Sequence, residues 1–231
     1  MARKRKSHAI TTLLFDFGGT LAFLDYELLA REFSRPGRKL TPEQLERAEY
    51  MGRRRLDETL TAEGATLPGA YEALMRGWFE AAGIPEPEFA IHQARFRQIH
   101  RAQTLWRVIR PGTIQALDRM KRAGLKLGIV SNAEGQIEGD AKRMGLTPYF
   151  DVIIDSHVVG VAKPDPRIFQ IALDRVGSKP SETLFAGDIY SIDMLGASAA
   201  GIKGKLIDQM EMYDWIDHPR IKGVGELHRL S

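Results

Sequence analysis

The chain has 231 residues, which suffices for one sizeable hydrophobic core, with or without an inserted subdomain, and excludes a large multidomain assembly. It contains no cysteine, so disulfides, thiolate metal sites and a cysteine nucleophile are excluded, and a reducing cytoplasm is the expected location. The net charge is +3, and much of the excess lies in residues 3–6. We interpret residues 1–8 as a basic disordered tail rather than a nucleic-acid site. No apolar run reaches the roughly 18–20 residues that cross a bilayer.

Short apolar runs rich in Val, Ile, Leu and Phe recur along the chain and indicate buried strands. They cover residues 9–17, 126–132, 150–156, 183–188 and 203–208. Helical spacing of apolar residues, each time followed by a glycine, covers residues 113–123, 136–144, 166–176 and 191–200. This alternation predicts a doubly wound α/β fold with a parallel sheet.

Residues 24–107 interrupt the alternation with charged, helix-forming sequence that has no strand-like run. Thr41, Pro42 and Gln44 form the pattern of a helix start, with Thr41 as the N-cap. We therefore expect a helical subdomain inserted into a core of residues 9–23 and 108–231. We interpret the charges of this insertion as an ordinary solvated helix face. They include Arg53, Arg54, Arg55, Arg95, Arg97 and Arg101, balanced by Glu43, Glu46, Glu49, Asp57 and Glu58.

Polar residues follow four of the predicted strands. Parallel strands bring their carboxyl ends to one edge of the sheet, which is where ligands bind in open α/β sheets. Carboxylates suit Mg²⁺, a lysine and a hydroxyl neutralise phosphate oxygens, and glycines let backbone N–H groups approach an anion. Together these residues predict phosphoryl transfer to an aspartate. In chain order they are Asp16, Gly18, Gly19, Thr20, Ser131, Asn132, Lys163, Pro164, Gly187, Asp188 and Asp193.

The segments "DFGGTL", "VSNA", "VAKPDPRIF" and "AGDIYSIDMLGASAAG" resemble, in order, the four motifs of the haloacid dehalogenase (HAD) superfamily. The resemblance covers the core almost end to end and implies a Rossmann-like HAD core. Residues 24–107 resemble, by position, the helical (C1-type) cap that closes over the site and sets substrate choice. The resemblance implies a phosphatase-like hydrolase that acts on a small phosphorylated metabolite. We expect no nucleic-acid or membrane partner, and a monomer or homodimer.

The resemblance implies a Mg²⁺ site. Asp16 would accept the phosphoryl group and also ligate Mg²⁺, and Asp188 would be the second carboxylate on the metal. The family also uses the backbone carbonyl at the position of Gly18 as a metal ligand. Asp193 would hold either the metal site or the neighbouring lysine.

The resemblance also implies a phosphate site. Thr20 and Ser131 would hydrogen-bond the transferring group, assisted by backbone N–H groups near Gly19 and Asn132. Lys163 would neutralise the charge that the nucleophile and the phosphate share.

The first motif departs from the family pattern Asp-x-Asp-Gly-Thr, whose second Asp protonates the leaving oxygen and later activates water. Gly18 stands at that position. A positioned general acid or base contributes on the order of 10²–10⁴ in rate, about 3–5 kcal/mol of barrier, which is a minority of the acceleration for phosphate monoesters. Replacement acids could be Asp25, His92 or His100. We expect instead that Asp25 caps a helix or faces water, and that both histidines lie on a helix surface.

Two alternatives remain open. The first is a non-catalytic or weakly active phosphate-binding HAD pseudo-enzyme, since Ile189 and Ile192 stand where the family usually has polar residues near the metal. The second is a dehalogenase or a phosphonate C–P hydrolase, because both also lack the second Asp. Dehalogenases, however, lack the metal-binding residue that Asp188 would supply, and the phosphonate branch uses a cap lysine where Arg55, which cannot form an imine, stands.

Overall fold

The computed structural model describes residues 9–62 and 67–229. The predicted basic tail, residues 1–8, lies outside the described residues. The chain divides into two compact units. The core unit holds the chain up to Leu21, Ile109–Ile207 and the chain from His218 on, and the second unit holds Ala22–Val108 and Asp208–Asp217. The expected insertion, residues 24–107, did not include this last segment. Within the described ranges, no helix is long and apolar enough to span a bilayer.

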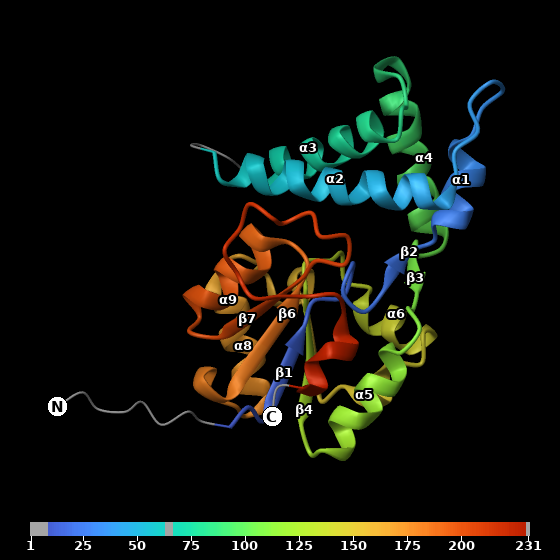
Figure 1. Ribbon diagram of the computed structural model, residues 1–231. Helices are drawn as coiled ribbons and strands as arrows, with labels where there is room; N and C mark the ends of the chain where they lie inside the picture. Colours follow the sequence, from blue (N-terminus) through green and yellow to red (C-terminus); the bar gives the residue numbers. More distant parts are fainter. Residues whose placement is uncertain (1–8, 63–66, 230–231) are drawn as a thin grey trace. The chain divides into compact units, whose positions relative to one another are not determined.

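The core unit is built on a six-stranded sheet in the order β5-β4-β1-β6-β7-β8, with every pair of neighbours parallel (Figure 1). The strands are β1 (Thr12–Phe15), β4 (Lys126–Ser131), β5 (Val152–Asp155), β6 (Thr183–Gly187), β7 (Lys203–Ile207) and β8 (Arg220–Ile221). The prediction of a doubly wound parallel sheet is thus confirmed. Strand β8 was not predicted, because two residues are too short to carry an apolar run.

Helices cover both faces of this sheet, with α5 (Thr113–Arg122) and α6 (Ile137–Arg143) on one face and α8 (Pro166–Val176) and α9 (Leu195–Ala199) on the other (Figure 1). The predicted helix 191–200 is divided, since a π-helical turn, η4 (Tyr190–Met194), precedes α9. The shorter elements are α7 (Ser156–Val159) and the 3₁₀ turns η2 (Thr147–Tyr149), η3 (Pro180–Glu182) and η5 (Val224–Arg229).

The central strands are apolar throughout because both of their faces are covered. All four residues of β1 and all five of β6 are buried. Gly128 of β4 gives its neighbours room, since a Cβ there would lie 2.6 Å from side-chain carbons of both Leu14 and Val152. Such a sheet holds its strand ends rigidly, and these ends carry the predicted site residues.

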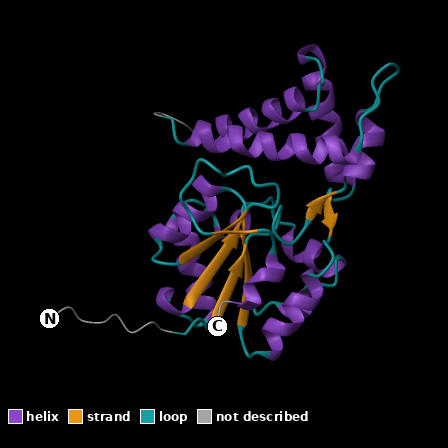
Figure 2. Cartoon of the chain, in the orientation of Figure 1, coloured by secondary structure: helices purple, strands orange, loops and turns teal. Residues whose placement is uncertain are grey.

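The second unit is mainly helical (Figure 2). Its helices are α1 (Tyr26–Phe33), α2 (Pro42–Leu60), α3 (Leu67–Ala81) and α4 (Phe89–Ala102), with the turn η1 (Glu86–Glu88) before α4. A short antiparallel pair, β2 (Phe23–Leu24) and β3 (Trp106–Val108), joins its two ends. The expectation that this region holds no strand was wrong here, because strands of two and three residues leave no pattern. Thr41 does cap α2, and its hydroxyl accepts the Gln44 N–H at 3.2 Å.

Helices α2 and α3 pack at close range because Gly52 lies between them. A Cβ on Gly52 would lie 2.6 Å from the carbonyl oxygen of Leu74 and 3.1 Å from the backbone nitrogen of Trp78. Trp78 is 1% exposed, contacts the ring of Phe33 and donates its indole N–H to the carbonyl of Leu45 at 2.9 Å. An aromatic core therefore depends on a glycine in a helix.

One charged face of α2 is buried rather than solvated. Glu49, Arg53 and Asp57, spaced four residues apart, are all buried. The Arg53 Nε donates to Glu49 Oε1 at 2.8 Å, and the Tyr213 hydroxyl donates to Asp57 Oδ2 at 2.6 Å. The sequence interpretation was wrong for these three residues because a partner distant in sequence, Tyr213, covers part of the stripe. This contact explains why residues 208–217 belong to the second unit.

Replacing Gly52 by alanine should lower the free energy of unfolding by about 1–3 kcal/mol, because the new Cβ meets backbone that cannot yield. Gly139→Ala in α6 is the matched control, since its Cβ would meet only the tip of the Arg143 side chain, at 3.3 Å. That change should stabilise by about 0.5–1 kcal/mol through helix propensity. Urea denaturation measures both, and equal effects of the two changes would contradict the packing argument.

Candidate active site

Three elements of the core unit bring carboxylates to one edge of the sheet. Asp16 follows β1, and its N–H donates to the carbonyl of Ala186 in β6 at 2.8 Å. Asp188 follows the end of β6, and Asp193 lies in the π-helical turn η4. All three side chains are buried. The strand ends predicted from the sequence therefore meet.

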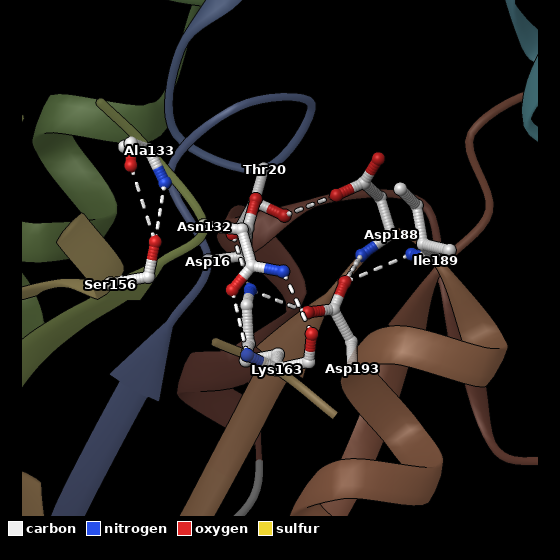
Figure 3. Close-up of polar contacts among 9 residues, drawn as sticks. All are labelled: Asp16, Thr20, Asn132, Ala133, Ser156, Lys163, Asp188, Ile189 and Asp193. Carbon is white, nitrogen blue, oxygen red and sulfur yellow. Dashed lines mark hydrogen bonds and ion pairs between the residues drawn. The ribbon is translucent and has the colours of Figure 1, made fainter. Parts of the chain in front are cut away.

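Lys163 joins two of these carboxylates. Its Nζ donates to Asp16 Oδ1 at 2.5 Å and to Asp193 Oδ1 at 2.6 Å (Figure 3). The lysine comes from the loop between α7 and α8 and is only 1% exposed. An ammonium removed from water so completely is stable only because charged acceptors surround it.

The pKa values of this group reflect burial and charge together. Burial raises the pKa of Asp16 from 3.8 to about 6; the charge of Lys163 opposes this and the charge of Asp193 adds to it. Burial also lowers the pKa of Lys163, but the attraction of Asp16 and Asp193 outweighs it, so that this pKa lies above its usual value. The lysine therefore stays charged, and Asp16 becomes ionised only as the pH rises through about 6.

Asp193 uses both of its carboxylate oxygens within the protein. Oδ1 accepts from Lys163, and Oδ2 accepts the backbone N–H groups of Asp188 and Ile189, each at 3.0 Å. Gly187 makes room for it, because a Cβ there would lie 2.5 Å from the Asp193 carboxyl carbon. These contacts suit the role of holding the lysine and the loop after β6. The other predicted role, holding the metal, stays a prediction.

The first motif supplies a hydroxyl and a turn in which Gly19 has a positive φ. The Thr20 Oγ1 donates to Asp188 Oδ1 at 3.2 Å, which links the first and fourth motifs. Gly19 has a φ of 79°, a conformation that disfavours other residues, whereas Gly18 is not among the glycines with positive φ. Ser131 ends β4, next to β1, and is buried. The φ of residue 18 therefore does not by itself require glycine.

The charges of the site suit a divalent cation. Three carboxylates, Asp16, Asp188 and Asp193, accompany one ammonium, which leaves an excess of two negative charges when all are ionised. Nowhere in the described chain do three His, Cys, Asp or Glu side chains gather as a ready metal site. A hard cation here would use two carboxylates and oxygens from the backbone, substrate or water, as Mg²⁺ commonly does.

Asp25, one candidate for the missing general acid, is bound to other partners. Asp25 caps α1 by accepting the Leu28 N–H at 2.8 Å, as expected, and it pairs with Arg107 at 2.5 Å. Burial raises the pKa of Asp25, but these partners outweigh it and hold the pKa below its ordinary value. A carboxylate that stays ionised is a poor proton donor.

The two histidines of α4 do not both lie on its surface. The His92 side chain is fully buried among the rings of Phe33 and Phe79, so that expectation was wrong, and burial lowers its pKa. Aromatic residues from two other helices enclose it, which its own helix could not reveal. His100 is half-buried, and its Nδ1 accepts the Leu105 N–H at 3.2 Å.

Sequence reasoning missed two side chains that organise the site loops. The Asn132 amide bonds to the backbone of Lys163, and the Ser156 hydroxyl bonds to the backbone of Ala133 (Figure 3). The "SNA" of the second motif pointed to Asn132 only for its backbone N–H. No local pattern reveals which distant loop such an amide holds.

Comparison with known families matches residues 10–201 to haloacid dehalogenase-like hydrolases. The chain belongs to this family of hydrolases. "Haloacid dehalogenase-like hydrolase domain-containing protein 3" of Danio rerio is 30% identical over 191 residues, covering 80% of this chain and 78% of that protein. The Mus musculus protein of the same name is 33% identical over 137 residues, covering 59% of this chain but only 54% of its own length.

Two further relatives carry phosphatase names. The "Glyceraldehyde 3-phosphate phosphatase" of Methanothermobacter thermautotrophicus is 35% identical over 99 residues, covering 42% of this HAD-like chain and 44% of that protein. The crystal structure of a HAD phosphatase from Thermococcus onnurineus has 25% identity and a TM-score of 0.58, covering 96% of this chain and 97% of that one. The Rossmann-like HAD fold is thus confirmed.

Asp16 should make the stability of the metal-free protein depend on pH. Its pKa is about 6 in the folded state and 3.8 ordinarily, so the folded state binds this proton more tightly than the unfolded chain. The resulting stabilisation is complete below the ordinary pKa and is lost as the pH rises through about 6. Relative to Asp16→Asn, the wild type should therefore lose stability from about pH 4 to about pH 7, by an amount on the order of a few kcal/mol.

Urea unfolding in the presence of a chelator, at both pH values, measures this difference. Glu43→Gln, which removes an exposed carboxylate, controls for the change in charge alone. Parallel pH profiles for wild type and Asp16→Asn would contradict the raised pKa.

Proposed function

We propose that this HAD-like hydrolase is a Mg²⁺-dependent phosphatase that acts on a small phosphorylated metabolite in the cytoplasm through an aspartyl-phosphate at Asp16. The observation that carries the proposal is the buried Lys163 ammonium, held between Asp16 and Asp193 at 2.5 and 2.6 Å. A lysine beside a carboxylate nucleophile neutralises the charge that a phosphate brings to it. The phosphatase names of two relatives support the same reaction class.

Asp16, Asp188 and the backbone carbonyl of Gly18 would hold Mg²⁺. The two excess negative charges of the site and its all-oxygen donor set support a hard divalent ion. When bound, Mg²⁺ supplies positive charge that stabilises the phosphoryl oxygens and orients the phosphate. Asp193 would then act through Lys163 and the loop after β6, and not as a ligand.

The proposed reaction has two displacement steps. First, an Asp16 carboxylate oxygen forms a bond to phosphorus while the bond from phosphorus to the substrate's oxygen breaks. Thr20 and Ser131 would donate hydrogen bonds to the transferring group, and Lys163 would stabilise its charge. Water then attacks phosphorus, which breaks the bond from phosphorus to Asp16, releases inorganic phosphate and restores the Asp16 carboxylate. Of the two protons of this water, one ends on the alcohol and one on the phosphate.

Gly18 is expected to limit the rate of this reaction. Without a carboxylic acid at this position, an alkoxide leaving group departs without its proton, while a phenolate or a sugar anomeric oxygen departs more readily. The loss amounts to on the order of 10²–10⁴ in rate. We propose that the substrate has a good leaving group, and that the helical second unit is the cap that selects it.

The protein should hydrolyse p-nitrophenyl phosphate slowly with Mg²⁺ and accumulate an acid-stable phosphoprotein after rapid quenching. Asp16→Asn should lower turnover by on the order of 10³-fold or more, because it removes the nucleophile. Gly18→Asp should speed turnover, by up to on the order of 10²–10⁴, because it restores a carboxylic acid at a position whose φ does not require glycine.

Gly223→Asp adds the same charge where a Cβ would meet nothing within 4 Å, and should leave turnover unchanged. Absence of turnover and of Mg²⁺ binding in every variant would instead indicate the pseudo-enzyme. Metal-independent fluoride release from fluoroacetate would indicate the dehalogenase.

Mg²⁺ should raise the thermal stability of the protein, by about 2.7 kcal/mol at 100 times its dissociation constant. Asp188→Asn should show a much smaller increase, because it removes one of the proposed ligands and keeps the shape and the oxygen that accepts from Thr20. Asp174→Asn, at an exposed position of α8, should respond like the wild type. Equal Mg²⁺ shifts for all three proteins would contradict the proposed site.

A further inference from the structure

The backbone of Lys163 is held by one side chain, that of Asn132. Asn132 Nδ2 donates to the carbonyl of Lys163 at 2.8 Å, and the N–H of Lys163 donates to Asn132 Oδ1 at 2.7 Å (Figure 3). Both backbone groups of the lysine thus bond to one planar amide. Asn132 directly follows β4, a central strand of the sheet, so the amide stands on a rigid support.

The loop that carries Lys163 is also restricted by α9. Gly196 of α9 approaches so closely that a Cβ there would lie 3.0 Å from both the Cα and the carbonyl oxygen of Pro164. The Lys163–Pro164 backbone therefore contacts both the Asn132 amide and α9. The ammonium at the end of the side chain then reaches Asp16 and Asp193 with little freedom, because the residue is 1% exposed.

We propose that Asn132 is a positioning residue: its side-chain amide sets the place of the Lys163 ammonium between the nucleophile and Asp193. This inference rests on the proposed function of Lys163 and adds a role for the amide, distinct from the backbone N–H of the second motif. Errors of about 1 Å in the position of a group at a reacting centre can cost on the order of 10²-fold in rate. Two hydrogen bonds from one rigid side chain limit such errors.

Ser156 provides a matched control. Its hydroxyl accepts the Ala133 N–H at 3.0 Å and donates to the Ala133 carbonyl at 3.2 Å, so it also holds one residue by both backbone groups. It acts on the same loop as Asn132 but has no bond to Lys163 among those described. Ser156→Ala therefore removes a comparable pair of hydrogen bonds and leaves the lysine attached.

Turnover of p-nitrophenyl phosphate with Mg²⁺ tests the positioning role. Asn132→Ala should lower kcat about 10- to 100-fold with KM changed less than about 3-fold, because the lysine matters most where charge develops. Asn132→Asp keeps the acceptor for the Lys163 N–H but cannot donate to the Lys163 carbonyl. Its kcat should therefore lie between those of the wild type and Asn132→Ala. Ser156→Ala should lower kcat clearly less than Asn132→Ala does, because it leaves both backbone bonds of Lys163 in place.

Amine labelling by reductive methylation, read by mass spectrometry, tests the placement without activity. Lys163 should be protected in the wild type and in Ser156→Ala, and should be labelled several-fold faster in Asn132→Ala and Asn132→Asp. Unchanged labelling and kcat in both Asn132 variants, or equal effects from Ser156→Ala, would overturn the inference. A wild type without turnover would reject the proposed function, while the labelling result would still decide whether Asn132 holds the lysine.

Discussion

The buried ammonium of Lys163 is the constraint on which the site depends. A charge removed from water costs several kcal/mol unless acceptors of opposite charge replace the solvent. Asp16 and Asp193 are these acceptors, at 2.5 and 2.6 Å. Because they come from β1 and from the turn after β6, the interaction ties together segments that are far apart in the sequence. The candidate site therefore also links these segments structurally.

The residues around this interaction fix the positions of the neighbouring loops. Gly187 and Gly196 have no side chains where a Cβ would strike Asp193 and Pro164, respectively. Asn132 and Asp193 use their side chains to hold backbone N–H and C=O groups of the adjoining loops. Glycines and short polar side chains thus let three loops approach one another closely, with backbone groups bonded to side chains. Catalytic proteins need such rigid support, since positioning accounts for a large part of rate enhancement.

The sequence predicted those features that local physics determines. The central strands β1 and β6 are buried throughout because the sheet is covered on both faces, and Thr41 caps α2 through its own local hydrogen bonds. Motif order placed Asp16, Lys163, Asp188 and Asp193 at one sheet edge. What could not be predicted depends on distant partners: His92 is enclosed by rings from other helices, and the Asn132 amide holds a loop 31 residues away. Strands β2, β3 and β8 are too short to leave a pattern.

The segment Asp208–Asp217 means that the second unit cannot be treated as a single insertion, either in evolution or in experiments. A simple insertion has one entry and one exit, whereas this chain enters the second unit at Ala22 and again at Asp208. The later segment, Asp208–Asp217, supplies the buried hydrogen bond from the Tyr213 hydroxyl to Asp57. Excising residues 22–108 would therefore leave residues 208–217 without the helices against which their hydrophobic groups and the Tyr213 hydroxyl pack. A second unit exchanged between relatives would need to carry both of its chain segments.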